Sequence, residues 1–497
     1  MLGATVGFNF NLAIIIVIFV LLLNACQPLA KELIPVTSEN GFSVYLPLLM
    51  NAGEIITSPP DNLPIVHLPF QQTNDYTKDY FSQMAIFWFG KVEINTNYYD
   101  VRIGYGPDAL YLYIATFDRL LWYDKTPSAD ELPDWDSISL YINPASSNQL
   151  VANQAAKFVA SLAPFELSRD RYQAAYRWNG TQWVRGNYAF TTIADWRGEA
   201  MNDPDDDRGW NISFKIPFSS LGIFQQPLEN NIWRMAITGH DRDYLNGDTI
   251  PPQNWPAAFS ESEATNWGSL SFGLLPNGTI NGTSQGNLII QEGLNGTIVQ
   301  DASPGGFTVC GDNLNFWTQW GEKVYTPTDN YTAVVQNQRD IADWPCYSKY
   351  FLAFPISSIP ANTAILSAKL KLHLYGNSGK WNDPVFHPYR SLIQVSRSGG
   401  GWNENSLNWN NAPQLLENIS QTWVDPIETF SGWPGVPYEW DVATALRKAI
   451  QDNESMLYLA LYSADGAYHS GKYFSTSEVE DWNAAARPAL IVNYGTP

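Results

Sequence analysis

Residues 134–144 read DWDSISLYINP, and apolar and polar side chains alternate within this stretch. Ile138, Leu140 and Ile142 occupy every second position, with serine or tyrosine between them. A period of two places alternate side chains on opposite faces of a β-strand, so the pattern predicts a half-buried strand. The same alternation recurs at 212–216, 368–374 and 457–461. Because only residues 442–451 read as a helix, the chain is expected to be all-β.

The composition of the 497-residue chain excludes several classes of protein. Lys and Arg total 28 against 49 Asp and Glu, which gives a net charge of −21. A nucleic-acid binder, or a protein docked electrostatically on an anionic membrane, would need the opposite balance. Aromatic residues make up 14% and charged residues only 15%. This balance argues against a disordered chain and against a helical bundle.

The N-terminus reads as an export signal. Residues 12–23 are apolar, and this run is too short to span a bilayer, which needs about 20 residues. Its length suits a secretory signal peptide over residues 1–25. Cys26 directly follows Ala25, and this placement resembles a bacterial lipoprotein signal, which implies that Cys26 carries the lipid. An uncleaved membrane anchor with an incidental Cys26 is the alternative. Either interpretation places the remaining chain at the cell surface, outside the cytoplasm.

Composition shifts divide the exported part into segments. Five prolines punctuate the polar stretch after Cys26, so residues 26–61 are expected to form a tether. The Gly-rich and polar residues 276–287 read as a linker. The two remaining segments, 62–275 and 288–497, are each expected to fold as a jelly-roll-like β-sandwich.

Cys310 and Cys346 are the remaining cysteines of the chain. In an oxidising compartment, two lone thiols in one domain most simply form a disulfide. Two buried reduced thiols are the alternative.

The first sandwich carries an ordered set of short motifs. The segments are 100–105, 110–115, 134–144 and 209–218, followed by Trp255-Pro256 and Trp267-Gly268. Their order resembles the carbohydrate-binding module family 9-like domains, β-sandwiches related to DOMON domains. The resemblance implies that a sugar ring is clamped between aromatic faces, beside polar groups that bond its hydroxyls.

Four aromatic residues are candidates for that carbohydrate clamp. Where the family places one clamp tryptophan the chain has Pro133, and Trp135 lies two residues on. Trp255 and Phe259 lie near the second clamp position, and Trp122 lies in the loop after the strand at 110–115. Each of these rings has core packing as its alternative role.

The second sandwich carries a further ordered set of motifs. They include 351–360, 365–370, 401–410, 440–446 and 487–492. This set resembles the DNRLRE domain and carbohydrate-binding module family 96. The resemblance implies a jelly-roll-like sandwich of a secreted or surface protein, without identifying a ligand.

The motifs of common catalytic sites do not occur in the sequence. It has no nucleophile elbow, phosphate-binding loop or metalloprotease His pair. The acidic run with Asp203, Asp205 and Asp207 is a candidate for a structural Ca²⁺ site, because Ca²⁺ prefers several oxygen ligands. A solvated acidic turn is the alternative.

Together these patterns predict a non-catalytic surface lipoprotein that binds polysaccharide through aromatic-lined β-sandwiches. A structural or adhesive envelope protein, with sandwiches that contact other proteins, is the alternative. A glycan-cleaving enzyme is a third, and it would require two facing carboxylates in a cleft.

Overall fold

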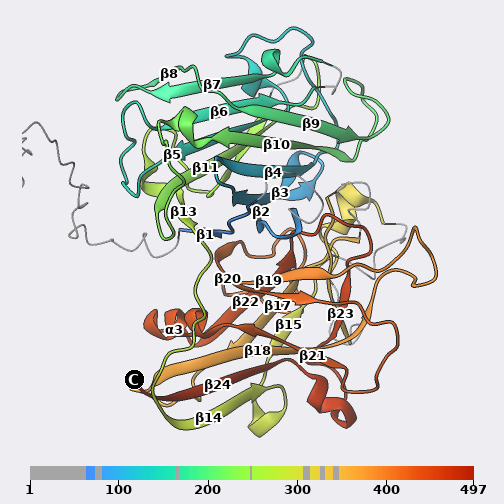
Figure 1. Cartoon of the computed structure of the whole chain (residues 1–497). Helices are drawn as coiled ribbons and strands as arrows, with labels where there is room; N and C mark the ends of the chain where they lie inside the picture. The colour runs from blue at the N-terminus through green and yellow to red at the C-terminus, as the bar shows by residue number, and fades with distance from the viewer. Residues whose placement is uncertain are drawn as a thin grey trace, which may run out of the picture. The chain divides into compact units, whose positions relative to one another are not determined.

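The part of the chain that the structure describes is built mainly from β-sheets, with short helices between the strands (Figure 1). The computed structural model describes residues 63–72, 81–163, 167–246, 249–305, 314–324, 331–339 and 346–497. The predicted signal peptide, Cys26 and the tether up to residue 61 lie outside the described residues. None of the helices in these ranges is long and apolar enough to cross a bilayer. The predicted all-β fold class is confirmed.

The largest sheet, sheet A, contains strands from both halves of the chain. Its order is β15 (Gln300–Ala302), β17 (Tyr350–Pro355), β22 (Met456–Ser463), β19 (Ser391–Ser398), β20 (Leu415–Val424), β1 (Ile65–Leu68), β13 (Gly268–Phe272), β11 (Ile232–Asp241), β5 (Ser137–Asn143), β6 (Ala156–Ser161), β7 (Gln173–Trp178) and β8 (Trp183–Arg185), with β12 (Ile250–Trp255) paired to β11. The two halves join at β1, which lies parallel to β13 on one side. On its other side, Ile65 pairs with Glu417 of β20.

Two smaller sheets cover sheet A. Sheet B has the order β2 (Ala85–Glu93), β3 (Thr96–Tyr105), β4 (Ala109–Phe117), β10 (Gly209–Pro217) and β9 (Thr191–Arg197). Sheet C has the order β14 (Thr283–Gln291), β24 (Ala489–Thr496), β18 (Ala364–Asn377), β23 (Lys472–Ser475) and β16 (Thr332–Val335), with β21 (Val436–Asp441) paired to β18. The helical turns are η1 (Leu132–Asp134), η2 (Arg169–Arg171), η3 (Phe218–Leu221), η4 (Ala264–Asn266), η5 (Leu294–Gly296), η6 (Phe316–Trp320), α3 (Ala443–Gln451) and η9 (Asp481–Ala486).

Each small sheet encloses a hydrophobic core against its own half of sheet A. The N-terminal sandwich buries Leu140, Ile237, Ile114 and Ile212 from the two facing sheets. The C-terminal sandwich buries Leu352, Leu459, Leu370 and Leu490 in the same way. Burying one such aliphatic side chain stabilises the fold by about 2 kcal/mol, so these cores hold the sheets together. The fold is a pair of β-sandwiches that share one sheet.

The structure differs from the predictions in three places: in one strand, in the linker and in the helix. β10 alternates as expected, but β5 is buried on both faces. Its outer face is covered because Ser139 Oγ bonds His240 Nε2 at 2.9 Å and the Tyr141 ring lies 5.7 Å from that of Trp267. The predicted linker is shorter, because β14 begins at Thr283 and pairs along the edge of sheet C. The predicted helix begins one residue later, at Ala443.

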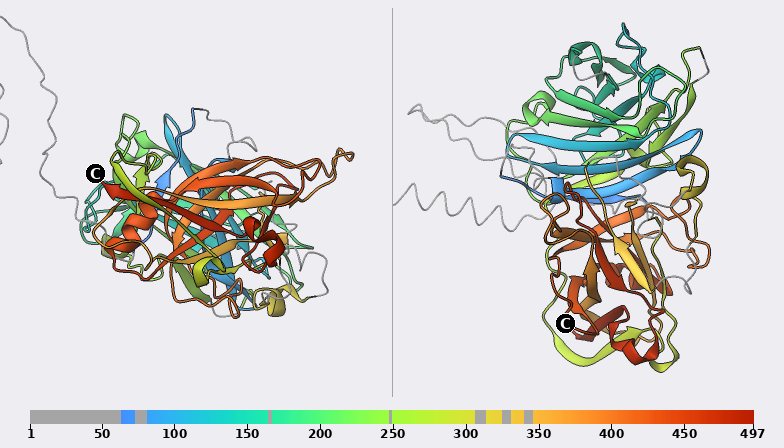
Figure 2. Two further views of the ribbon diagram at one scale, coloured as in Figure 1. Left: turned by 90° about the horizontal axis from the view of Figure 1, so that it is seen from below. Right: turned by 90° about the vertical axis from the view of Figure 1, so that its right-hand side faces the viewer.

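Polar side chains of β3 reach into the C-terminal sandwich. Arg102, fully buried, donates from Nε to Ala464 O at 3.1 Å and from Nη2 to Gln338 O at 3.0 Å. Asp100, also fully buried, accepts hydrogen bonds from Asn337 Nδ2 and from the Tyr462 hydroxyl, at 2.9 and 3.0 Å. The right-hand view of Figure 2 shows the blue strands β2 and β3 next to the red and orange strands of the C-terminal sandwich.

Lys349 lies at the centre of this junction in a cage of aromatic rings. Its Nζ is 3.6 Å from the ring centroid of Trp409, 4.0 Å from that of Trp88 and 4.6 Å from that of Tyr98. The Tyr462 ring lies 5.2 Å away. Burial lowers the pKa of Lys349 well below its usual value, and the carboxylate of Asp100 opposes that shift. We call this arrangement the lysine cage.

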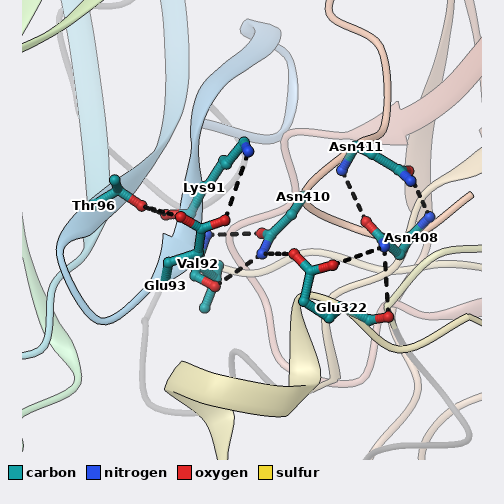
Figure 3. A network of polar contacts seen from close by, with 8 residues as sticks. All are labelled: Lys91, Val92, Glu93, Thr96, Glu322, Asn408, Asn410 and Asn411. Carbon is teal, nitrogen blue, oxygen red and sulfur yellow. Dashed lines mark hydrogen bonds and ion pairs between the residues drawn. The ribbon is translucent and has the colours of Figure 1, made fainter.

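A second polar contact joins the sandwiches through Asn410 (Figure 3). β2 has a bulge between Gly90 and Glu93, which frees the backbone of Val92 from pairing with β3. Val92 N donates to Asn410 Oδ1 at 2.9 Å, and Asn410 Nδ2 donates to Val92 O at 3.0 Å. Asn410 Nδ2 also donates to Glu322 Oε1 at 2.9 Å. The amide side chain of Asn410 therefore makes the two hydrogen bonds with the Val92 backbone that a neighbouring strand would otherwise make.

Asn410→Ala is expected to lower the free energy of unfolding by about 2 kcal/mol, because it leaves the buried N–H and C=O of Val92 unpaired. Asn405→Ala, in the same loop but exposed, is the matched control and is expected to change it by less than about 0.5 kcal/mol. Urea unfolding of the two variants measures both values. Equal effects would show that the Val92 contact contributes nothing specific.

Candidate functional site

The structure separates the four predicted clamp residues of the N-terminal sandwich. Trp255 is only 1% exposed, and its ring centroid lies 4.3 Å from that of Phe87 in the core. Trp122 is also buried. Neither ring therefore offers a free face to a sugar in this conformation.

The other two predicted residues are partly exposed but lie in different surroundings. The guanidinium of Arg242 covers the Trp135 ring at 4.6 Å from its centroid. Phe259 packs against Tyr141, with ring centroids 4.7 Å apart. In the described part of the chain these four rings contact other residues rather than one another.

Exposed aromatic rings gather instead on the C-terminal sandwich, around a hollow of about 330 Å³. We call it the aromatic hollow. Its lining comprises Tyr331, Tyr375, Trp433, Ser475, Val479, Glu480, Trp482 and Asn483. Trp482 is 66% exposed and Trp433 is 49% exposed, although large apolar surfaces normally face inward. The rings come from the residue before β16, from β18, from the loop before β21 and from η9.

The rings of the aromatic hollow form a continuous set of contacts. The centroid of Trp433 lies 5.7 Å from that of Trp482, at an interplanar angle of 85°. It lies 5.6 Å from that of Tyr375 and 4.9 Å from that of Phe430. The indole planes of Trp433 and Trp482 are therefore nearly perpendicular. Two ring faces at this angle suit a ligand that packs one apolar side on each indole.

Polar groups surround the rings. Trp482 Nε1 donates to Glu480 Oε2 at 3.1 Å, which orients the indole. The hydroxyl groups of Thr332 and Tyr375 are hydrogen-bonded to each other, and burial raises the pKa of Tyr375, so its phenol stays neutral. Ser475 Oγ and Asn483 Nδ2 are buried and lack a hydrogen-bond partner in the described residues. Apolar faces beside unpartnered polar atoms match the two kinds of surface that a sugar presents.

The aromatic hollow has only a weak signature in the sequence. Trp433 lies in the segment Gly432-Trp433-Pro434-Gly435, whose Gly and Pro residues indicate a turn and hence an exposed ring. Trp482 follows the acidic pair Glu480-Asp481. Nothing local shows that residues 433 and 482 meet.

A carboxylate cluster lies inside the N-terminal sandwich. Asp118, Asp136 and Asp241 are buried, and one oxygen of each lies within 4.8 Å of the others. Asp118 follows β4, Asp136 precedes β5 and Asp241 ends β11. Burial raises the pKa of Asp118 and Asp136 well above the usual range and that of Asp241 to about 8, and neighbouring aspartates add to each shift.

The hydrogen bonds of this cluster leave one of its oxygens without a partner among the described residues. Asp136 accepts from the backbone N–H groups of Trp122 and Arg242, at 2.6 and 2.9 Å. Asp118 accepts from Trp210 Nε1 at 3.2 Å. Asp241 Oδ1, in contrast, is buried without a partner among the described residues. Three carboxylates that each bring one oxygen within 4.8 Å of the others supply the oxygen ligands that Ca²⁺ prefers.

The predicted metal ligands Asp203, Asp205 and Asp207 are not arranged in this way. Asp207 is buried and accepts backbone N–H groups from Leu121 and Glu199, at 3.2 and 3.1 Å. Burial raises its pKa to about 7. Asp203 accepts from the backbone of Asp205 at 3.1 Å, which is the bonding of a turn. Their oxygens do not converge as a group of three in the described part of the chain.

Cys346 is disulfide-bonded. Its predicted partner, Cys310, lies outside the described residues, so the pairing stays a prediction.

Comparison with known proteins gives two kinds of similarity. Two solved structures of a carbohydrate-binding module family 9 from Caldicellulosiruptor kristjanssonii, one with cellotriose and one with glucose, share 10% and 12% identity with the chain. Each alignment covers 44% of this chain and 98% of the other, with a TM-score of 0.29. No curated protein matches the chain. Residues 326–494, which contain the whole aromatic hollow, match the model of carbohydrate-binding module family 96.

Proposed function

We propose that this protein captures glycans at the aromatic hollow of its C-terminal sandwich. The observation that carries the proposal is the presence of Trp433 and Trp482, exposed and nearly perpendicular, within the segment that matches a carbohydrate-binding module family. Sugar rings pack their C–H faces on indole, while their hydroxyls need hydrogen-bond partners. Glu480, which is exposed in the lining, supplies carboxylate oxygens beside the rings. The capture is non-catalytic in this proposal.

We further propose that the chain acts at the cell surface. The apolar run before Cys26 supports a lipid anchor there, and the Pro-rich residues up to 61 give the sandwiches reach. A tethered module meets a nearby polysaccharide at a high effective concentration, so even weak binding retains the ligand. Labelling with radioactive palmitate tests the anchor, and Cys26→Ser is expected to abolish the label.

Binding to a panel of plant, algal and microbial polysaccharides tests the proposed capture. The double variant Trp433→Ala/Trp482→Ala is expected to bind the retained glycan at least about 30-fold more weakly, because each ring contributes about 1 kcal/mol. Affinity electrophoresis measures the retention. Trp135→Ala, which removes a partly exposed indole from the other sandwich, is the matched control and is expected to change affinity less than twofold.

The outcomes separate the alternatives. Loss of binding in Trp135→Ala alone would move the site to the N-terminal sandwich. Absence of binding to the whole panel would contradict glycan capture and favour the structural or adhesive role.

We also propose that the carboxylate cluster holds a structural Ca²⁺. Ca²⁺ would supply positive charge to three buried carboxylates whose mutual repulsion and burial otherwise favour the protonated form. Asp136 would then tie the cation to the loop at Trp122 and to the end of β11 at Arg242.

A further inference from the structure

A second hollow, of about 610 Å³, opens at one end of the N-terminal sandwich. It lies where β5 and β10 end, β6 begins and the β7–β8 hairpin forms the edge of sheet A. The lining residues are Pro144, Asn153, Gln154, Arg177, Arg185, Gly186, Asn187, Tyr188, Ser219, Ser220, Leu221, Gly222 and Ile223. We call it the arginine hollow. It shares no residue with the aromatic hollow or with the four predicted clamp residues.

The charge of the arginine hollow is opposite to that of the protein. The chain carries a net charge of −21, yet no acidic residue lines this hollow. Arg177 is exposed and forms no ion pair with any described residue. Its side chain lines the hollow together with Tyr188. Arg185 differs, because its guanidinium lies over the ring of Tyr176 at 5.1 Å.

Neutral groups complete the arginine hollow. The hydroxyl of Tyr188 is buried without a hydrogen-bond partner among the described residues. Asn153, Asn187 and the serines of η3 add amide and hydroxyl groups. Directly after Ile223 of the lining comes Phe224, which is 85% exposed. Neutral polar groups thus occur together with an arginine that has no ion pair among the described residues.

We propose that the arginine hollow binds an acidic glycan, with Arg177 pairing to a carboxylate or sulfate ester on the sugar. A guanidinium forms two parallel charge-assisted hydrogen bonds with either group, and no acidic residue lines this hollow to compete for it. Asn153 and Asn187 would bond the neighbouring hydroxyls. The inference extends the proposed glycan capture to a second site, and it does not depend on the aromatic hollow being occupied.

Calorimetric titration of the full-length chain tests the site with three probes: a galacturonate pentamer, its methyl ester and a sulfated galactan oligosaccharide. Arg177→Met is expected to weaken binding of an anionic probe at least about tenfold. Arg177→Lys is expected to restore part of the affinity, because it keeps the charge but loses the paired bonds. Arg171→Met removes an exposed arginine outside the hollow and is the matched control, expected to change affinity less than twofold.

The same titrations show which outcome holds. Dependence on Arg177 with the galacturonate but not with its ester identifies a carboxylate ligand, and dependence with the galactan identifies a sulfate. Equal binding by Arg177→Met and the unmodified chain, or no binding of either anionic probe, would overturn the inference. Loss of anionic binding only in Trp433→Ala/Trp482→Ala would also overturn it, while leaving the proposed capture at the aromatic hollow intact. Thermal melting of Arg177→Met confirms that the variant is folded.

Discussion

Chelation of Ca²⁺ is expected to lower the melting temperature of this protein by about 5 °C or more. A cation held by Asp118, Asp136 and Asp241 would stabilise the folded state by about 4 kcal/mol when its concentration is 1,000 times Kd. For a unit of this size, that free energy corresponds to a few degrees. Differential scanning calorimetry in Ca²⁺ and in a chelator measures the difference.

Variants of single aspartates show whether the carboxylate cluster is responsible. Asp241→Asn is expected to remove most of the Ca²⁺-dependent shift, because it replaces the carboxylate whose Oδ1 is unpartnered. Asp203→Asn, in the acidic turn, is expected to keep it. A shift that survives Asp241→Asn but disappears in Asp203→Asn would place the ion in the turn instead.

Replacing Lys349 by alanine is expected to lower the free energy of unfolding by about 3–5 kcal/mol. The substitution empties the lysine cage and leaves a cavity among four aromatic rings. It also removes the hydrogen bond from Nζ to the Tyr98 hydroxyl, at 2.5 Å. Trp88 and Tyr98 belong to the N-terminal sandwich and Trp409 to the C-terminal one, so the damage falls on the junction. Urea unfolding followed by tryptophan fluorescence measures it.

Lys349→Met is the matched control, because methionine has a similar length and fills the cage without a charge. Methionine conserves most of the buried volume, so its expected cost is below about 1.5 kcal/mol. If methionine cost as much as alanine, the charge of Lys349 rather than its packing would hold the junction.

The strands were predictable because their signal is local. Alternation within 137–143 depends on neighbouring residues only, and β5 has those bounds. The burial of both its faces was not predictable, because His240 and Trp267 reach it from β11 and from the start of β13, about 100 residues away. The sharing of sheet A by the two sandwiches was not predictable for the same reason, since Ile65 and Glu417 lie far apart in the chain.

The candidate sites were harder to predict than the fold. Aspartates 203, 205 and 207 were predicted as metal ligands because they are close in sequence. Asp118, Asp136 and Asp241, in contrast, converge only after folding. Trp255 and Trp433 are the same type of residue, but the Trp255 ring is buried in the core and the Trp433 ring is exposed on the surface. Residue type alone does not distinguish them, because exposure depends on the sheet that covers each ring.

The position of β1 determines how the fold bears a mechanical load. Any pull on the chain before residue 63 reaches the fold through this four-residue strand, which lies between β13 and β20. Since β1 runs parallel to both neighbours, the pull acts along the strands and loads their hydrogen bonds in shear, all together, rather than opening them one after another. His67 strengthens the connection between β1 and β20, because its backbone N–H and C=O are both hydrogen-bonded to the side-chain amide of Asn418, at 2.7 and 2.9 Å. Force applied at the N-terminus is thereby divided between the two sandwiches.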